Sequence, residues 1–235
     1  MTEVAKVRAA ALHLYTASGA ALAFLATMEI CAPAPDPRRV FVLLAAAVLV
    51  DATDGPLARR WEVKRWLPAI DGRTIDDIVD YLTYTFVPLL LIWRMGWVPE
   101  PGIVWVAPAL LASLFGFANA AIKDETGGFF LGFPSYWNVV AFYAGFVHRL
   151  YGPGINAVAI VLLAVATVLP IRFLYPNLMH PPWRAPVIVG AFLWLGAMLL
   201  MLPDYPRAPV WAAWASLVYP AFYVWLSFRL GRSTR

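Results

Sequence analysis

Long apolar runs separated by short polar stretches dominate this 235-residue chain. Most of these runs have about the length that an α-helix needs to cross a hydrocarbon layer of roughly 30 Å, although the fifth is short. The expected spans cover approximately residues 10–31, 39–60, 74–94, 102–122, 135–149, 153–174, 184–202 and 208–228. The connections between them are short, so the pattern predicts an all-α polytopic membrane protein forming one domain over residues 1–235.

Composition supports this prediction. Hydrophobic residues make up 62% of the chain and charged residues only 14%, whereas soluble domains carry about 25% charged residues. The apolar run that follows Lys6 and Arg8 is long for a signal peptide, and no clean A-x-A cleavage site follows it, so we expect a first membrane helix. A single cysteine excludes an intrachain disulfide, and the three histidines show no metal-ligand spacing.

The distribution of basic residues predicts the orientation. Eight spans place both termini on one side of the membrane, and lysine and arginine favour the cytoplasmic side. Thirteen of the 18 basic residues fall on the side of the termini, so we expect both termini in the cytoplasm. The net charge of +4 therefore reports membrane topology, and no nucleic-acid motif accompanies it.

Six aspartates interrupt this apolar chain between residues 51 and 80. Asp51 and Asp54 lie three residues apart, and Asp76 and Asp80 lie four residues apart, so each pair shares one face of a helix. Two such helices joined by a short loop can point their carboxylates at one another. Four clustered negative charges near a bilayer repel each other unless a cation is present, and carboxylate oxygens suit Mg²⁺ or Mn²⁺. The pattern indicates a divalent-metal site for phosphate chemistry at the cytoplasmic side.

The same stretch reads D-x-x-D-G-x-x-A-R, a spacer, then G-x-x-x-D-x-x-x-D. This resembles the signature of the CDP-alcohol phosphatidyltransferases, membrane enzymes that make phospholipids from CDP-diacylglycerol and an alcohol. The matching residues are Asp51, Asp54, Gly55, Ala58, Arg59, Gly72, Asp76 and Asp80. The twelve-residue spacer 60–71 and the run FLGFPSYWN at 130–138 are similar to the bacterial branch that uses free choline as the acceptor.

The resemblance implies a role for each signature residue. The implied metal ligands are Asp51, Asp54, Asp76 and Asp80, with Asp80 also acting as the base that takes the proton of the acceptor hydroxyl. The implied contacts of CDP-diacylglycerol are Gly55, Ala58, Arg59 and Gly72. The family also implies Mn²⁺ or Mg²⁺ as cofactor, a homodimer, and a multi-pass protein of the bacterial inner membrane whose active site opens to the cytoplasm. Pro56 departs from the pattern of a regular helix and could kink the second span.

Choline carries a quaternary ammonium without donor hydrogens, which aromatic faces and nearby negative charge can hold. Tyr84, Tyr136 and Trp137 are the candidate choline contacts, and the alternative interpretation places them in the interfacial aromatic belt. Lys123 is a candidate contact of a substrate phosphate, or one more basic residue of the cytoplasmic side.

Two alternatives remain open on the sequence. The acceptor could be serine, inositol phosphate or glycerol phosphate with the same chemistry, although the spacer argues against this. A transporter with membrane carboxylates would instead show inverted repeats and midplane charges, and the sequence has neither.

Overall fold

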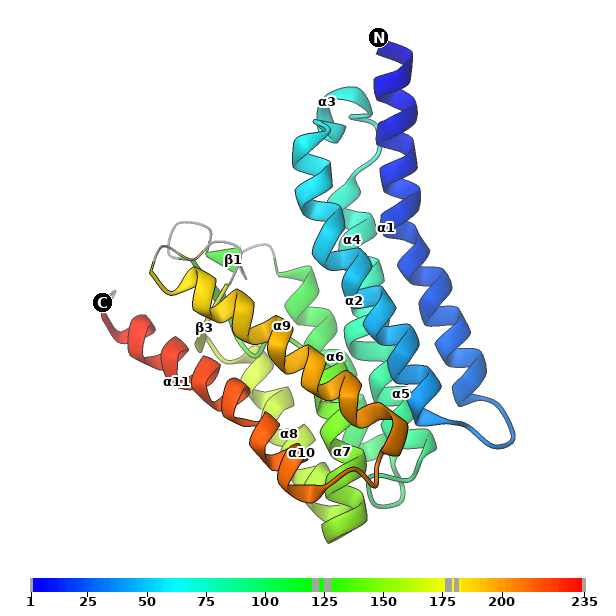
Figure 1. Ribbon diagram of the computed structural model, residues 1–235, viewed down its shortest axis with the longest axis vertical. Coiled ribbons are helices and arrows are strands. Elements are labelled where there is room, and N and C mark those ends of the chain that lie inside the picture. Colours follow the sequence, from blue (N-terminus) through cyan, green and yellow to red (C-terminus); the bar gives the residue numbers. More distant parts are fainter. Residues whose placement is uncertain (1, 120–122, 125–127, 176–178, 180–181, 234–235) are drawn as a thin grey trace.

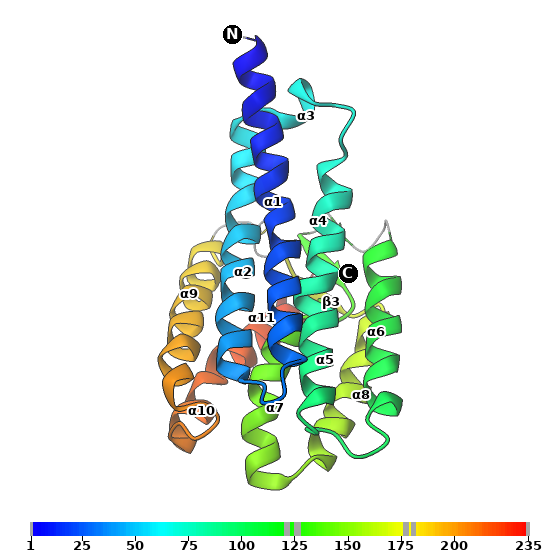
Figure 2. The same cartoon turned by 90° about the vertical axis from the view of Figure 1, so that its right-hand side faces the viewer.

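In the computed structural model, long helices pack side by side, some with their neighbour in sequence and others with a helix further along the chain (Figures 1 and 2). The structure describes residues 2–119, 123–124, 128–175, 179 and 182–233. The helices are α1 Thr2–Ile30, α2 Pro37–Arg60, α3 Val63–Trp66, α4 Gly72–Asp80, the π-helix η1 Tyr81–Phe86, α5 Val87–Arg94, α6 Ile103–Ala118, α7 Trp137–Tyr151, α8 Gly154–Val168, α9 Arg184–Met201, the 3-10 helix η3 Leu202–Asp204, α10 Val210–Ser216 and α11 Val218–Ser233. The strands are β1 Lys123–Asp124, β2 Phe129–Leu131 and β3 Arg172–Leu174.

Four helical stretches are long and apolar enough to cross a membrane: Glu3–Ile30, Pro37–Arg60, Arg184–Asp204 and Val210–Gly231. The helices α6 and α8 are apolar but shorter. These features confirm a predominantly helical membrane protein. The crossing of the membrane by all eight predicted segments, and the cytoplasmic position of both termini, stay predictions.

Helix α2 begins with a capped first turn. The Asp36 carboxylate accepts the backbone N–H of Arg38 at 3.0 Å, and Pro37 occupies the first helical position, where a missing N–H costs nothing. The helix continues through Pro56 to Arg60. Proline removes one hydrogen bond of the ladder, and the turns on both sides keep the helix continuous.

Helix α4 also begins at an aspartate cap. Asp71 accepts the Thr74 hydroxyl at 2.9 Å and the Arg73 backbone N–H at 3.1 Å. The Thr74 hydroxyl, followed by that N–H, holds the pKa of Asp71 below its ordinary value. Helix α1 packs on this first turn, because a Cβ at Gly72 would lie 2.9 Å from Cε1 of His13. Glycine at this position therefore permits the close approach of α1.

The helix that follows Asp80 changes its hydrogen-bond pattern for six residues, forming η1. The N–H of Val87 donates to the carbonyl of Leu82, five residues earlier. Pro88 has no N–H to donate to the Tyr84 carbonyl. A regular α-helix would therefore also lack one backbone hydrogen bond at this point. Single π-turns of this kind redirect side chains and are frequent at functional sites.

A small antiparallel sheet, in the order β1-β2-β3, replaces part of the helix expected over 153–174. Helix α8 ends at Val168, and Leu169 is extended because the residue before a proline is disfavoured in the helical region. Phe130 pairs with Phe173 across β2 and β3. Helix α11 covers β3, where the Ser227 hydroxyl accepts the Leu174 N–H at 3.1 Å. The expectation of helix at 172–174 was therefore wrong.

Gly132 joins the sheet to α7 in a conformation that only glycine adopts easily. Its φ is +86°, its N–H donates to the Ile171 carbonyl at 2.7 Å, and an added Cβ would collide with the Thr167 carbonyl oxygen. We expect Gly132→Ala to destabilise the protein by about 2 kcal/mol, because left-handed strain and overpacking both apply. The melting temperature in detergent should fall by about 5 °C. Gly154→Ala is the matched control, because nothing lies within 4 Å of its added Cβ, and an equal fall there would contradict the explanation.

Candidate metal centre

Three carboxylates meet between α2 and α4. Asp51 comes from α2, and Asp76 and Asp80 lie one turn apart on α4. One ligand oxygen from each residue lies within 4.8 Å of the others, and all three side chains are half-buried. We call these three residues the carboxylate centre. Its donors are hard anionic oxygens at a spacing that one divalent cation can bridge, so the residues fit Mg²⁺ or Mn²⁺.

Tyr84 of η1 joins the carboxylate centre directly. Its hydroxyl donates to Oδ2 of Asp51 at 2.7 Å, which links α2 to the helix that carries Asp76 and Asp80. The Tyr84 ring lies 6.1 Å from the ring of Tyr136, measured between centroids, at an interplanar angle of 54°. Two of the three aromatic candidates are therefore neighbours beside the carboxylates.

The third aromatic candidate has a different environment. Trp137 is fully buried, and its indole N–H donates to the Ser113 hydroxyl at 2.7 Å. Ser135 donates to the same hydroxyl at 3.0 Å. Tyr136 in contrast is 37% exposed. Of these adjacent residues, Tyr136 therefore keeps part of its surface accessible, whereas Trp137 is enclosed in the core.

Asp54 is outside the three-residue group. Its side chain is only 6% exposed and forms a hydrogen bond with the hydroxyl of Thr16 on α1. This contact fixes α2 against α1, two helices that pack along much of their length (Figure 2). Thr16 and His13 of α1 are thus neighbours of the motif that sequence reasoning missed, because no spacing within one helix reports a contact with another.

The motif residues that follow Asp54 on α2 lie in the last turns of that helix. Arg59 is exposed, and its Nη1 would lie 3.6 Å from a Cβ added at Gly55, so its side chain folds back along α2. Ala58 packs against a small apolar cluster that contains Leu12 of α1. Lys123 lies in β1 and its side chain is outside the described residues.

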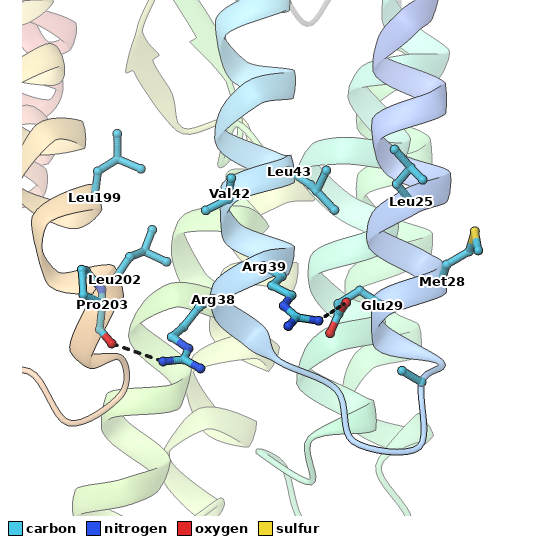
Figure 3. A pocket seen from close by; sticks show the side chains of 11 residues that line it. Leu25, Met28, Glu29, Arg38, Arg39, Val42, Leu43, Leu199, Leu202 and Pro203 are labelled. Atoms are coloured by element: carbon cyan, nitrogen blue, oxygen red, sulfur yellow. Dashed lines mark hydrogen bonds and ion pairs between the residues drawn. The ribbon is translucent and has the colours of Figure 1, made fainter.

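A groove elsewhere in the molecule is lined by α1, α2 and α9, near the first turn of α2 and far along that helix from Asp51 (Figure 3). Its walls are mostly apolar. Two ion pairs lie at this groove: Nη2 of Arg38 is 2.8 Å from Oδ2 of Asp36, and Nη1 of Arg39 is 3.5 Å from Oε2 of Glu29. Because these charges are paired within the protein, the groove lacks the concentrated charge of the carboxylate centre.

The fold and the site define a helical membrane protein with an acidic centre suited to a divalent cation and phosphate chemistry. The chain matches no model of a known protein family. It is 37% identical to a phosphatidylcholine synthase of Pseudomonas aeruginosa, with 97% of this chain and 96% of the relative covered. It is 35% identical to the phosphatidylcholine synthase of Rhizobium meliloti, with 97% of this chain and 95% of the relative covered. It is 36% identical to the phosphatidylcholine synthase of Agrobacterium fabrum, with 88% of this chain and 84% of the relative covered. The chain belongs to the phosphatidylcholine synthase family, which confirms the branch that the spacer indicated.

Proposed function

We propose that this protein transfers the phosphatidyl group of CDP-diacylglycerol to the hydroxyl of choline, forming phosphatidylcholine and releasing CMP. The observation that carries the proposal is the carboxylate centre, three carboxylates from two facing helices with ligand oxygens within 4.8 Å. Membership of the phosphatidylcholine synthase family supports choline as the acceptor.

The carboxylate centre would hold Mn²⁺ or Mg²⁺, which when bound neutralises charge on the diphosphate and on its leaving group. Asp51, Asp76 and Asp80 supply the ligands in this proposal. Asp54 stays a predicted ligand, and its hydrogen bond with Thr16 would have to be exchanged for it to serve as one. Tyr84 orients Asp51 through its 2.7 Å hydrogen bond.

Asp80 takes the proton of the choline hydroxyl. The hydroxyl oxygen then forms a bond to the phosphorus that carries the diacylglycerol, and the bond from that phosphorus to the oxygen of CMP breaks. Arg59 would contact a phosphate, Gly55 and Ala58 would leave room for the nucleoside, and Lys123 stays a candidate phosphate contact.

Choline recognition is assigned to the aromatic rings beside the centre. The Tyr84 hydroxyl is engaged by Asp51, so in this proposal the trimethylammonium group contacts the ring of Tyr84 and the ring of the partly exposed Tyr136. The buried Trp137 would support Tyr136 from the core instead of touching the ligand.

The whole chain, 1–235, would act as one catalytic domain in the bacterial inner membrane, and we expect a homodimer. The amino-terminal end of α1, the end of α2 and the short helix α3 lie together at one end of the molecule (Figure 1). This end carries Lys6, Arg8, Arg59, Arg60, Lys64 and Arg65. Such a concentration of basic residues supports a cytoplasmic position for this end and for the mouth of the site.

The proposal is tested with purified protein, CDP-diacylglycerol and one labelled acceptor per reaction: choline, serine, inositol phosphate or glycerol phosphate. We expect product only in the reaction whose acceptor is choline. Product with a different acceptor would overturn the assignment of choline while leaving the transfer chemistry in place.

Removing the Tyr136 ring should weaken choline binding selectively. We expect Tyr136→Ala to raise the KM for choline by about tenfold, because a cation–π contact at a partly desolvated site is worth roughly 1 to 2 kcal/mol. The KM for CDP-diacylglycerol should stay the same, and Tyr136→Phe, which keeps the ring, should behave like the wild type. Steady-state kinetics with both substrates varied measures this, and an unchanged choline KM in the alanine variant would argue against the contact.

A further inference from the structure

Tyr84 links the two helices that supply the carboxylate centre. Asp51 is the member of that centre on α2, whereas Asp76 and Asp80 both lie on α4. The Tyr84 hydroxyl donates to Oδ2 of Asp51 at 2.7 Å, and Tyr84 belongs to η1, which continues α4 without a break. Helix α2 also packs against η1. The hydrogen bond therefore spans the junction at which Asp51 has to meet the other two carboxylates.

The π-turn of η1 explains how Tyr84 reaches this position. A regular α-helix turns about 100° per residue, so a step of four residues overshoots a full turn by about 40°. Two such steps, from Asp76 to Asp80 and from Asp80 to Tyr84, would carry Tyr84 about 80° away from the direction of Asp76. In η1 the N–H of Val87 instead donates to the Leu82 carbonyl, five residues earlier, and this wider turn rotates each residue less. The π-turn thereby keeps Tyr84 on the face that carries the two aspartates.

The hydrogen bonding of η1 is incomplete at another position. The Thr83 hydroxyl donates to the Val79 carbonyl, four residues earlier, at 2.9 Å. Thr85 is fully buried, and within the described part of the chain its hydroxyl has no hydrogen-bond partner. An unsatisfied buried hydroxyl costs free energy, so local hydrogen bonding does not account for η1. Unfavourable local structure of this kind persists where its surroundings require it, and η1 provides the contact between Tyr84 and Asp51.

A hydrogen bond to one oxygen of a metal-binding carboxylate influences the metal without touching it. The bond limits rotation of the carboxylate, so less conformational freedom is lost when a cation binds. A phenol suits this role because it donates one hydrogen bond and adds no charge. The ring of Tyr84 is itself confined, since the ring of Tyr136 lies beside it with centroids 6.1 Å apart. Tyr84 can therefore hold Asp51 in one orientation.

We propose that Tyr84 is a positioning residue that sets the affinity of the carboxylate centre for its divalent cation, and that the π-turn of η1 holds it on Asp51. This inference rests on the metal site of the proposed function and deepens it. Tyr84 lies four residues beyond Asp80, the last aspartate of the signature, so the signature does not include it. The strength of metal binding then depends on a residue outside the motif that supplies the ligands.

The test compares Mn²⁺ binding by the wild type, Tyr84→Phe and Tyr81→Phe. Each protein is treated with EDTA, the EDTA is removed, and free Mn²⁺ is measured by electron paramagnetic resonance during a titration. We expect Tyr84→Phe to raise the Kd for Mn²⁺ by about tenfold, because it loses only the hydroxyl that holds Asp51. Tyr81→Phe is the matched control, since Tyr81 lies in the same π-turn and its hydroxyl donates to the Leu110 carbonyl of α6 at 3.3 Å. Its Kd should equal that of the wild type.

Transfer assays separate a positioning role from a purely structural one. In Tyr84→Phe the Mn²⁺ concentration that gives half-maximal transfer should rise by the same factor as the Kd, and excess Mn²⁺ should recover most of the turnover lost at low Mn²⁺. A purely structural role would instead lower turnover at every Mn²⁺ concentration. Should Tyr84→Phe yield too little protein for titration, the rise in melting temperature that Mn²⁺ causes in detergent is the second measurement, and we expect a smaller rise than in the wild type.

The outcomes distinguish this inference from the proposed function. An unchanged Kd for Mn²⁺ in Tyr84→Phe would overturn the inference and leave the proposed transfer to choline intact. An equal rise of the Kd in Tyr81→Phe would also overturn it, because that result indicates a general loosening of η1. A wild-type protein that binds Mn²⁺ with the expected dependence on Tyr84 and transfers nothing to choline would overturn the proposed function alone.

Discussion

Asp80→Asn should abolish phosphatidyl transfer, lowering turnover by at least about a thousandfold. Asparagine keeps the shape of the side chain and removes its negative charge, so the variant loses both the base and one of the three carboxylates that meet within 4.8 Å. Asp76→Asn should have a comparable effect through the loss of a carboxylate at the same centre. Incorporation of labelled choline into lipid measures both variants, and gel filtration in detergent confirms that each is folded.

Asp77→Asn is the matched control for these variants. Asp77 is adjacent to Asp76 in sequence, but it pairs with Arg73 at 3.7 Å and is outside the carboxylate centre. A partly exposed ion pair of this kind contributes little to stability, so activity should stay within about threefold of the wild type. Turnover that survives in both Asp76→Asn and Asp80→Asn would remove these residues from the mechanism.

Chelation of divalent cations should reduce transfer to background, and Mn²⁺ or Mg²⁺ should restore it. The reason is electrostatic: Asp51, Asp76 and Asp80 repel one another when ionised, and the diphosphate of the substrate adds further negative charge. EDTA treatment followed by titration with each cation measures the loss and the recovery. Full turnover in excess EDTA would contradict the assignment of the carboxylate centre as a metal site.

Binding of the cation can also be followed without activity. Mn²⁺ at a hundred times its Kd should stabilise the protein by about 2.7 kcal/mol, because it binds the folded state selectively. This appears as a rise in melting temperature in detergent. Asp76→Asn should lose most of the rise, whereas Asp77→Asn should keep it, which separates binding at the carboxylate centre from general charge effects.

Much of the architecture follows from local rules that act along the chain. Apolar runs of membrane length predict helices because a backbone in lipid must satisfy its own hydrogen bonds, and helices occur within all eight predicted segments. The sequence also predicted that Asp51 faces Asp76 and Asp80. A spacing of four residues keeps two carboxylates on one helical face, and a short loop brings two helices together.

The tertiary structure decided the finer features. Asp54 lies roughly 60° around α2 from Asp51, and the packing of α1 gives it Thr16 as a partner. Pro88 and its neighbours set the π-turn that places Tyr84 on Asp51. Tyr84 and Tyr136 become neighbours, with ring centroids 6.1 Å apart, because η1 packs against the start of α7. Motif spacing reports neighbours along one helix, whereas these contacts depend on the packing of separate elements, which no local pattern encodes.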